Sequence, residues 1–197
     1  MVKKRFIYLM AMIVTLTMLP LVICSAQKVA LKTNFAYWPV LASPNASVEV
    51  KMSDKWTADL GGGFNLWAFK DGEMKIKHWA LQPEVRYWFC EVFNGTFVGM
   101  HAHGGMYNIG GFDIPVGRLK KFKEHRYEGY AYGLGVSIGH QWVLSRRWNL
   151  EASIGGGWAR THYSKFDCVT CGALQDEGVY DYFGVTRATL SLVYFIK

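Results

Sequence analysis

Hydrophobic and polar residues alternate with a period of two over most of this chain. The clearest case is the segment Tyr130–Trp142, whose even positions are mostly aromatic or aliphatic and whose odd positions are Ala, Gly, Ser or Gln. A helix repeats about every 3.6 residues and would not sort its residues by parity. The segment is therefore predicted to be a β-strand with one apolar face and one small or polar face.

The same alternation recurs in seven further segments, so eight strands are predicted. Their approximate extents are 31–37, 46–51, 56–66, 79–89, 98–106, 148–158 and 187–196. Aromatic residues gather near several predicted strand ends, where an interfacial girdle would need them. These are Tyr37-Trp38, Tyr87-Trp88-Phe89, Trp142 and Trp148.

The connections between these segments alternate in length. Short turns are predicted at Ser53–Lys55, Glu91–Gly95 and Leu144–Arg147, and longer links at Trp38–Asn45, Trp67–Lys77, Asn108–Arg126 and Thr161–Asp181. Outer-membrane barrels have an even number of antiparallel strands, short periplasmic turns and long extracellular loops. The sequence therefore predicts an all-β fold, namely an eight-stranded antiparallel up-and-down transmembrane β-barrel in the bacterial outer membrane.

A soluble β-sandwich or lipocalin-like barrel is the alternative, because it would show the same alternation with its apolar face turned inward. The chain is 16% aromatic and contains 21 glycines. Large aromatics on one parity and glycines on the other fit a narrow lumen better, so the membrane barrel is preferred.

The N-terminus has the pattern of a secretory signal. The basic residues Lys3–Arg5 precede the apolar run Phe6–Ile23, and Cys24-Ser25-Ala26 offers small residues at the positions that signal peptidase reads. Cleavage is therefore predicted after Ala26, which makes residues 1–26 a signal peptide and residues 27–197 the barrel domain. A retained transmembrane anchor is one alternative. A lipoprotein cut before Cys24 is another, although Ile23 is bulky where a small residue is needed.

Charge argues against a nucleic-acid partner. The formal net charge is +7, and the signal carries three positive charges and no acids, which leaves +7 − 3 = +4. Positive charge is concentrated in the loop segment Arg118–Arg126, not along one face. At an outer surface this segment could contact the phosphates of lipopolysaccharide. It could equally be a solvated loop.

Eight charged residues share the inward parity of the predicted strands. They are Lys32, Glu49, Lys51, Asp59, Glu84, Arg86, Glu151 and Arg187. An eight-stranded barrel has room inside for little except side chains. Because both signs are present, we expect a polar network that fills the lumen. A small ion path lined by the same residues is the alternative.

Two histidines also share the inward parity. His101 and His103 are two positions apart on one predicted strand and therefore face the same side. This spacing can bind zinc or copper, but such a site needs further ligands. Polar filling of the lumen is the simpler interpretation, and no metal or cofactor is predicted.

The longest predicted outer loop contains Cys168-Val-Thr-Cys171. The chain lacks a second CxxC for a zinc site, and processing would leave an odd number of cysteines, namely Cys90 and this pair. A local disulfide between Cys168 and Cys171 is preferred over a disulfide framework. Free thiols are the alternative in a reducing habitat.

His162-Tyr-Ser164 lies on the outward parity near the outer end of the seventh strand. It resembles the His-x-Ser of the lipid A deacylases, which are eight-stranded barrels with a serine-hydrolase site facing the outer leaflet. The match covers three residues, so His162 and Ser164 are candidates for catalysis only under an alternative function, with Asp167 or Asp181 as the acid.

A wider resemblance covers nearly the whole mature chain. It is carried by Leu31–Asn34, Gln82–Trp88, Gly99–Gly104, Tyr127–Gly129 with Gly133, Gly139–Trp142 and Ser191–Lys197. These stretches resemble an outer-membrane barrel family of unassigned activity, whose genes often stand beside fimbrillin genes. The resemblance implies a link with fimbria biogenesis or anchoring, and it supplies no catalytic residues.

The sequence therefore predicts a non-enzymatic outer-membrane barrel with a cell-surface role. Its expected partners are outer-membrane lipid, lipopolysaccharide, and fimbrial or other surface proteins. The alternatives are an outer-leaflet lipid A hydrolase and a small ion path.

Overall fold

The computed structural model describes residues 29–37, 43–66, 68–69, 74–111, 125–167 and 172–196, and these form an all-β structure. The strands are β1 (Val29–Asn34), β2 (Asn45–Lys51), β3 (Trp56–Asn65), β4 (Ala68–Phe69), β5 (Met74–Trp88), β6 (Gly95–Gly110), β7 (Arg126–Val143), β8 (Trp148–Phe166) and β9 (Leu174–Ile196). Strand β4 has only two residues and pairs with the start of β5. In these ranges there is no helix that is both long and apolar enough to cross a membrane.

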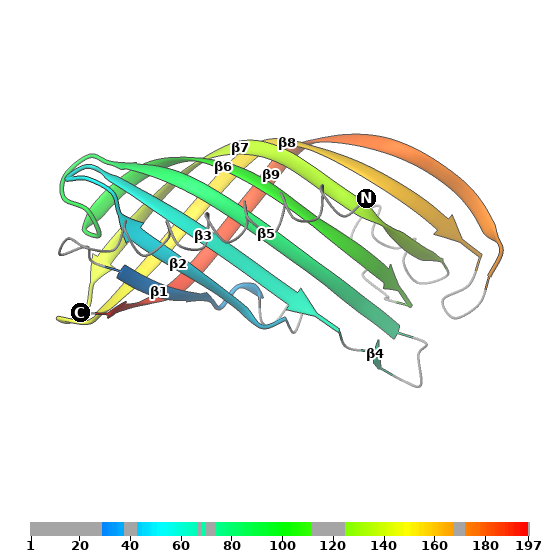
Figure 1. Cartoon of the computed structure of the whole chain (residues 1–197), viewed down its shortest axis with the longest axis horizontal. Coiled ribbons are helices and arrows are strands. Elements are labelled where there is room, and N and C mark those ends of the chain that lie inside the picture. The colour runs from blue at the N-terminus through cyan, green and yellow to red at the C-terminus, as the bar shows by residue number, and fades with distance from the viewer. Residues whose placement is uncertain are drawn as a thin grey trace, which may run out of the picture.

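The other eight strands close into a ring of antiparallel neighbours (Figure 1). Strand β3 pairs directly with β5, and β1 pairs with β9 from Val29 opposite Ile196 to Asn34 opposite Ser191. Every remaining pair joins strands that follow one another along the chain. The predicted eight-stranded antiparallel up-and-down barrel is confirmed.

The three short turns lie at one end of this ring, together with the start of β1 and the end of β9 (Figure 1). The backbone of Met52 donates to Trp56 O at 2.9 Å, and that of Leu144 donates to Trp148 O at 3.0 Å, so each strand pair is closed tightly. In the first turn Lys51 Nζ donates to Asp54 Oδ1 at 2.8 Å, and this hydrogen bond lowers the pKa of the exposed Asp54 carboxyl.

The predicted long link Thr161–Asp181 is wrong. Strands β8 and β9 stay in register from Thr161 opposite Tyr180 out to Ser164 opposite Glu177, and only residues 167–173 separate the two strands. Aromatic and β-branched residues such as Tyr163 and Val179 favour the extended strand here. The β8–β9 pair consequently projects beyond most of the ring (Figure 1).

The two faces of the ring have opposite chemistry. On β7 the outward residues Leu134 and Val136 are 60% and 62% exposed, whereas Glu49 and Arg86 in the interior are 0% exposed. Charged side chains are thus buried and large hydrophobic side chains are exposed. A soluble barrel would show the reverse arrangement.

A β-bulge at Thr186 changes the parity of β9. Gly155 pairs with Arg187 and the next residue, Gly156, pairs with Val185, so Thr186 is an extra residue. Between this point and a second register shift at Gln175, odd-numbered residues of β9 lie on the outward face, because a bulge of one residue exchanges the faces. Parity read from Arg187 alone therefore assigns this stretch of β9 to the wrong face.

Candidate functional site

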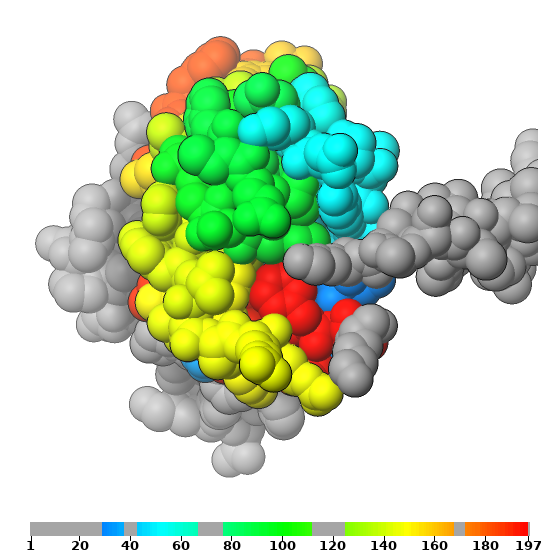
Figure 2. All heavy atoms as spheres, turned by 90° about the vertical axis from the view of Figure 1, so that its left-hand side faces the viewer, coloured from blue at the N-terminus to red at the C-terminus, as the bar shows by residue number. Residues whose placement is uncertain are grey.

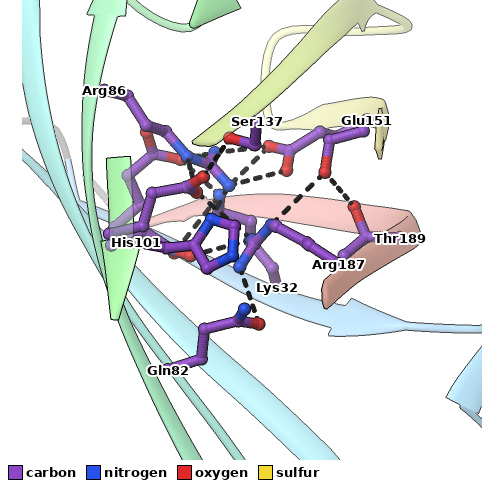
Figure 3. Close-up of polar contacts among 12 residues, drawn as sticks. Lys32, Gln82, Arg86, His101, Ser137, Glu151, Arg187 and Thr189 are labelled. Carbon is purple, nitrogen blue, oxygen red and sulfur yellow. Dashed lines mark hydrogen bonds and ion pairs between the residues drawn. The ribbon is translucent and has the colours of Figure 1, made fainter. Parts of the chain in front are cut away.

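Seven of the eight charged residues with inward parity come together in the middle of the lumen, as Figure 3 shows for Lys32, Arg86, Glu151 and Arg187, whereas Lys51 bonds Asp54 in the first turn. The seven come from β1, β2, β3, β5, β8 and β9, and none is more than 8% exposed. Residues from across the ring therefore meet in one cluster, because the interior of an eight-stranded barrel is narrow.

Arg86 on β5 is the centre of this cluster, since its guanidinium contacts four carboxylates. Nη1 lies 3.0 Å from Glu49 Oε2, and Nη2 lies 3.5 Å from Asp59 Oδ2. Nε contacts Glu84 Oε2 on the same strand. Glu151 accepts a bidentate pair of hydrogen bonds, from Nη1 to Oε2 at 2.9 Å and from Nη2 to Oε1 at 3.0 Å. This fork geometry is the arrangement in which Arg binds a carboxylate most specifically.

Lys32 on β1 binds the same group of acids from another side. Its Nζ contacts Glu49 Oε2 and lies 3.3 Å from Asp59 Oδ1 and 3.0 Å from Glu151 Oε2. Three of the four carboxylates are thus shared by Lys32 and Arg86. Sharing satisfies several lone pairs of each carboxylate, which a buried charge requires.

Arg187 on β9 completes the cluster on the side that lies away from the three short turns. Its Nη2 lies 3.4 Å from Asp59 Oδ2 and 3.3 Å from Glu84 Oε2. Its Nη1 donates to Gln82 Oε1 at 3.0 Å and its Nε donates to Ser153 Oγ at 3.4 Å.

The cluster contains four acids and three bases, a formal balance of 3 − 4 = −1. Neutral groups solvate the acids further, since Ser137 Oγ donates to Glu84 and Thr57 Oγ1 donates to Glu49. His101 lies opposite Glu84 in the β5–β6 ladder, and its Nε2 shares a hydrogen bond with Thr186 Oγ1 at 3.0 Å.

An aromatic layer fills the lumen between this cluster and the short turns. Trp88 and Phe97 are 0% exposed, and their ring centroids are 4.8 Å apart. Phe93 reaches in from the β5–β6 turn to within 6.0 Å of Trp88, and its φ of 67° is one that non-glycine residues seldom adopt. The Arg86 guanidinium lies 4.3 Å from the centre of the Phe97 ring, which joins the two layers. Figure 2 looks onto this end and shows no opening among the coloured atoms.

The structure corrects the expected position of Trp88, which the sequence predicts to lie in an interfacial girdle. Trp88 lies inside the lumen, and its Nε1 donates to Thr57 Oγ1 at 3.0 Å. The available signal was parity, because Trp88 follows Glu84 and Arg86 in steps of two. Its neighbour Phe89 is 53% exposed, as a girdle residue would be.

A cavity of about 380 Å³ occupies the other half of the lumen. Lys32, Asp59 and Arg187 contribute to one side of it, and Gly61 and Gly63 line its wall, where the missing side chains leave space. His103 also lines this cavity, with its ring centroid 5.8 Å from that of His101. Among the described residues no group of three or more His, Cys, Asp or Glu is placed to hold a metal ion.

Comparison with known proteins places the chain in a family. Residues 9–196 match the model of the family described as "Protein of unknown function (DUF3575)". The chain belongs to this family. No curated protein gave a match.

In this DUF3575 member the candidate hydrolase residues have other partners. The His162 ring is stacked on Tyr130, with centroids 4.5 Å apart, and Ser164 Oγ donates to Glu177 Oε1 at 3.3 Å. Of the two candidate acids, Asp181 accepts two hydrogen bonds from Arg160, at 2.9 and 2.8 Å, and Asp167 accepts one from Gln175 Nε2. The hydroxyl, the imidazole and both candidate acids are therefore each engaged with a different group.

Several sequence predictions fall outside the described residues. They are the signal peptide at residues 1–26, the pair Cys168 and Cys171, and residues 118–124 of the basic loop.

Proposed function

We propose that this protein is a non-enzymatic outer-membrane β-barrel that acts at the cell surface in fimbria biogenesis or anchoring. One observation carries the membrane part of this proposal, namely the inverted polarity of the ring. Lipid contact stabilises an apolar outer face, and only a closed ring leaves no strand edge to be solvated by hydrocarbon.

The height of the apolar face fits a bilayer. On β7 the outward aromatic residues Tyr132 and Trp142 are 142 − 132 = 10 positions apart, with Leu134, Val136 and Ile138 between them. At about 3.3 Å per residue and a tilt of about 40°, ten positions span about 25 Å, the height of the apolar band in outer-membrane barrels.

The blocked lumen supports a role other than transport. The charged cluster around Arg86 and the aromatic layer around Trp88 both lie across the interior. This arrangement argues against the small ion path, because ions would have to displace both layers. The outer loops and the projecting β8–β9 pair are then the surfaces that can bind a partner.

The fimbrial part of the proposal rests on the resemblance of the mature chain to barrels whose genes stand beside fimbrillin genes. It is tested in cells, by deleting the gene and measuring the fimbrial subunit at the surface with antibody. We expect surface fimbriae to fall and to recover on complementation. Unchanged surface fimbriae would contradict this part alone.

The membrane part is tested by Val136→Arg. An arginine on the lipid face near the midplane of a barrel costs about 2–4 kcal/mol, so folding into lipid vesicles should become that much less favourable. Ser145→Arg, in a short turn, is the matched control and should fold normally. If Val136→Arg folds as well as the wild type, the outward face does not contact lipid and the proposal fails.

A further inference from the structure

Strand β9 extends well beyond its neighbour β1. The β1 ladder ends with Asn34 opposite Ser191, and the last backbone contact is Phe35 N to Leu190 O at 2.8 Å. Strand β9 begins at Leu174, and β8 accompanies it along this whole length. On its other side, the described part of the chain places no strand beside β9 before Ala188.

The residues that face this open side can be identified. Leu190 directs its backbone N–H and C=O toward β1, and its side chain lies on the outward face. In a strand of given direction, residues with side chains on one face direct their backbone polar groups to the same side.

The outward face can be followed past the bulge at Thr186. Phe183 lies opposite Trp158, which lies opposite the outward residue Leu134, so all three share one face. Val179, Asp181 and Phe183 therefore direct their backbone groups to the open side, whereas the residues between them face β8.

This edge is accessible and has few of the features that protect natural sheet edges. Phe183 is 77% exposed and Val179 is 56% exposed. Residues 174–185 contain no Lys and no Pro, the residues with which proteins commonly block pairing. A long exposed edge of this kind is a template for another strand.

We propose that the β9 edge binds an extended segment of another polypeptide, which pairs as an additional antiparallel strand. This inference names the kind of partner for the proposed surface role. It rests on the proposed function in one respect, because that function places the edge on the outer side of the membrane. Backbone hydrogen bonds at Val179, Asp181 and Phe183 hold the segment.

Charge indicates the chemistry of the segment. Residues 174–185 include three acids and no base. Arg160 neutralises Asp181, whereas Asp176 and Glu177 accept hydrogen bonds from the hydroxyls of Tyr163 and Ser164. The segment carries Lys or Arg opposite Glu177, which shares the outward face of Val179 and Phe183, and apolar residues opposite Val179 and Phe183. A second copy of this edge fits less well, because it would bring like charges together.

The experiment uses the purified full-length protein in detergent and a fluorescent synthetic peptide. The probe alternates Thr with Val, and has Lys in place of Val at one end. Val179→Pro removes a backbone donor on the open side and keeps the bonds to β8, and Val179→Thr is the matched control. We expect the wild type and Val179→Thr to bind the probe, and Val179→Pro to bind it about tenfold or more weakly.

A second measurement does not depend on how the variant folds. N-methylation of alternate residues removes the probe's own donors, and we expect it to abolish binding to the wild type. Replacement of Lys by Glu should weaken binding about tenfold or more. The proposal is overturned if the unmodified probe does not bind, or if N-methylation or Val179→Pro leaves its affinity unchanged.

Sedimentation of the protein alone tests the other possible occupant of the edge, which is a second copy of this chain. A dimer of the wild type that Val179→Pro dissociates would assign the edge to a second copy and overturn the proposed partner. These binding assays need neither lipid nor fimbriae. A negative result in them therefore rejects the edge proposal alone, whereas normal folding of Val136→Arg into vesicles rejects the membrane part of the proposed function.

Discussion

Arg86 on β5 and Glu151 on β8 form a bidentate ion pair across the lumen, with N–O distances of 2.9 and 3.0 Å. Their side chains are 0% and 1% exposed, and two strands of the ring, β6 and β7, separate β5 from β8. The pair therefore connects walls of the barrel that share no backbone hydrogen bonds. A change at either residue should affect the ring as a whole.

Arg86→Ala is expected to destabilise the folded barrel. Removing one partner of a buried pair costs about 3–5 kcal/mol, because the remaining charges are left uncompensated. Here Glu49, Asp59, Glu84 and Glu151 would all lose a contact. The temperature at which the folded gel band converts to the unfolded band should fall.

Two comparisons make this result specific. Ser191→Ala, which is inward and buried but takes no part in the ion pairs, should leave the transition nearly unchanged. Adding Glu151→Ala to Arg86→Ala should restore part of the lost stability, because one fewer carboxylate is uncompensated. An unchanged transition in Arg86→Ala would show that the network does not stabilise the barrel.

Trp88→Ala should be much more damaging than Tyr87→Ala, although the two residues are adjacent. Trp88 is buried against Phe97, and truncating such a residue costs about 3–5 kcal/mol through the cavity that is left. Tyr87 lies on the outward face, in edge contact with Trp56. The gel transition measures both, and equal losses would mean that the aromatic layer does not support the fold.

The wild-type protein should show no sustained single-channel conductance in planar bilayers. The charged cluster and the aromatic layer lie in series, so opening either one alone leaves the other in place. Steady conductance of the wild type would favour the ion path and contradict a lumen blocked by these two layers.

Parity predicted the inward positions of the network, because in a strand the side of a residue follows from its position alone. It could not predict that Lys32 meets Glu151, 119 residues away. That contact depends on the register between β1, β9 and β8, which no local pattern encodes. For the same reason Ser137 could be placed inside, but not its hydrogen bond to Glu84.

The errors have physical causes as well. Trp88 was assigned by residue type to a girdle, whereas its parity indicated the lumen. The link Thr161–Asp181 is predicted only as the stretch between two alternating segments, whereas pairing with β8 keeps this stretch extended. A bulge such as Thr186 adds one residue without a sequence signal, so parity cannot be carried across it.

Processing is expected after Ala26, with no lipid on the mature N-terminus. Cys24 and Ala26 supply the small residues that signal peptidase needs, and Ile23 is too bulky for lipoprotein processing. Mass spectrometry of the N-terminal peptide from purified membranes decides this. A diacylated Cys24 would instead make the protein a lipoprotein.

Ser164→Ala is expected to leave the acyl pattern of lipid A unchanged. A serine hydrolase needs the hydroxyl hydrogen-bonded to its base, which removes the proton as the nucleophile attacks. Here Ser164 Oγ donates to Glu177, and the His162 ring lies against Tyr130. Mass spectrometry of lipid A is therefore compared between cells with the wild-type gene, the variant and no gene. Tyr163→Phe, which changes the inward neighbour, is the matched control. An acyl chain lost in the wild type but retained in both the variant and the deletion would establish a deacylase and overturn the non-enzymatic proposal.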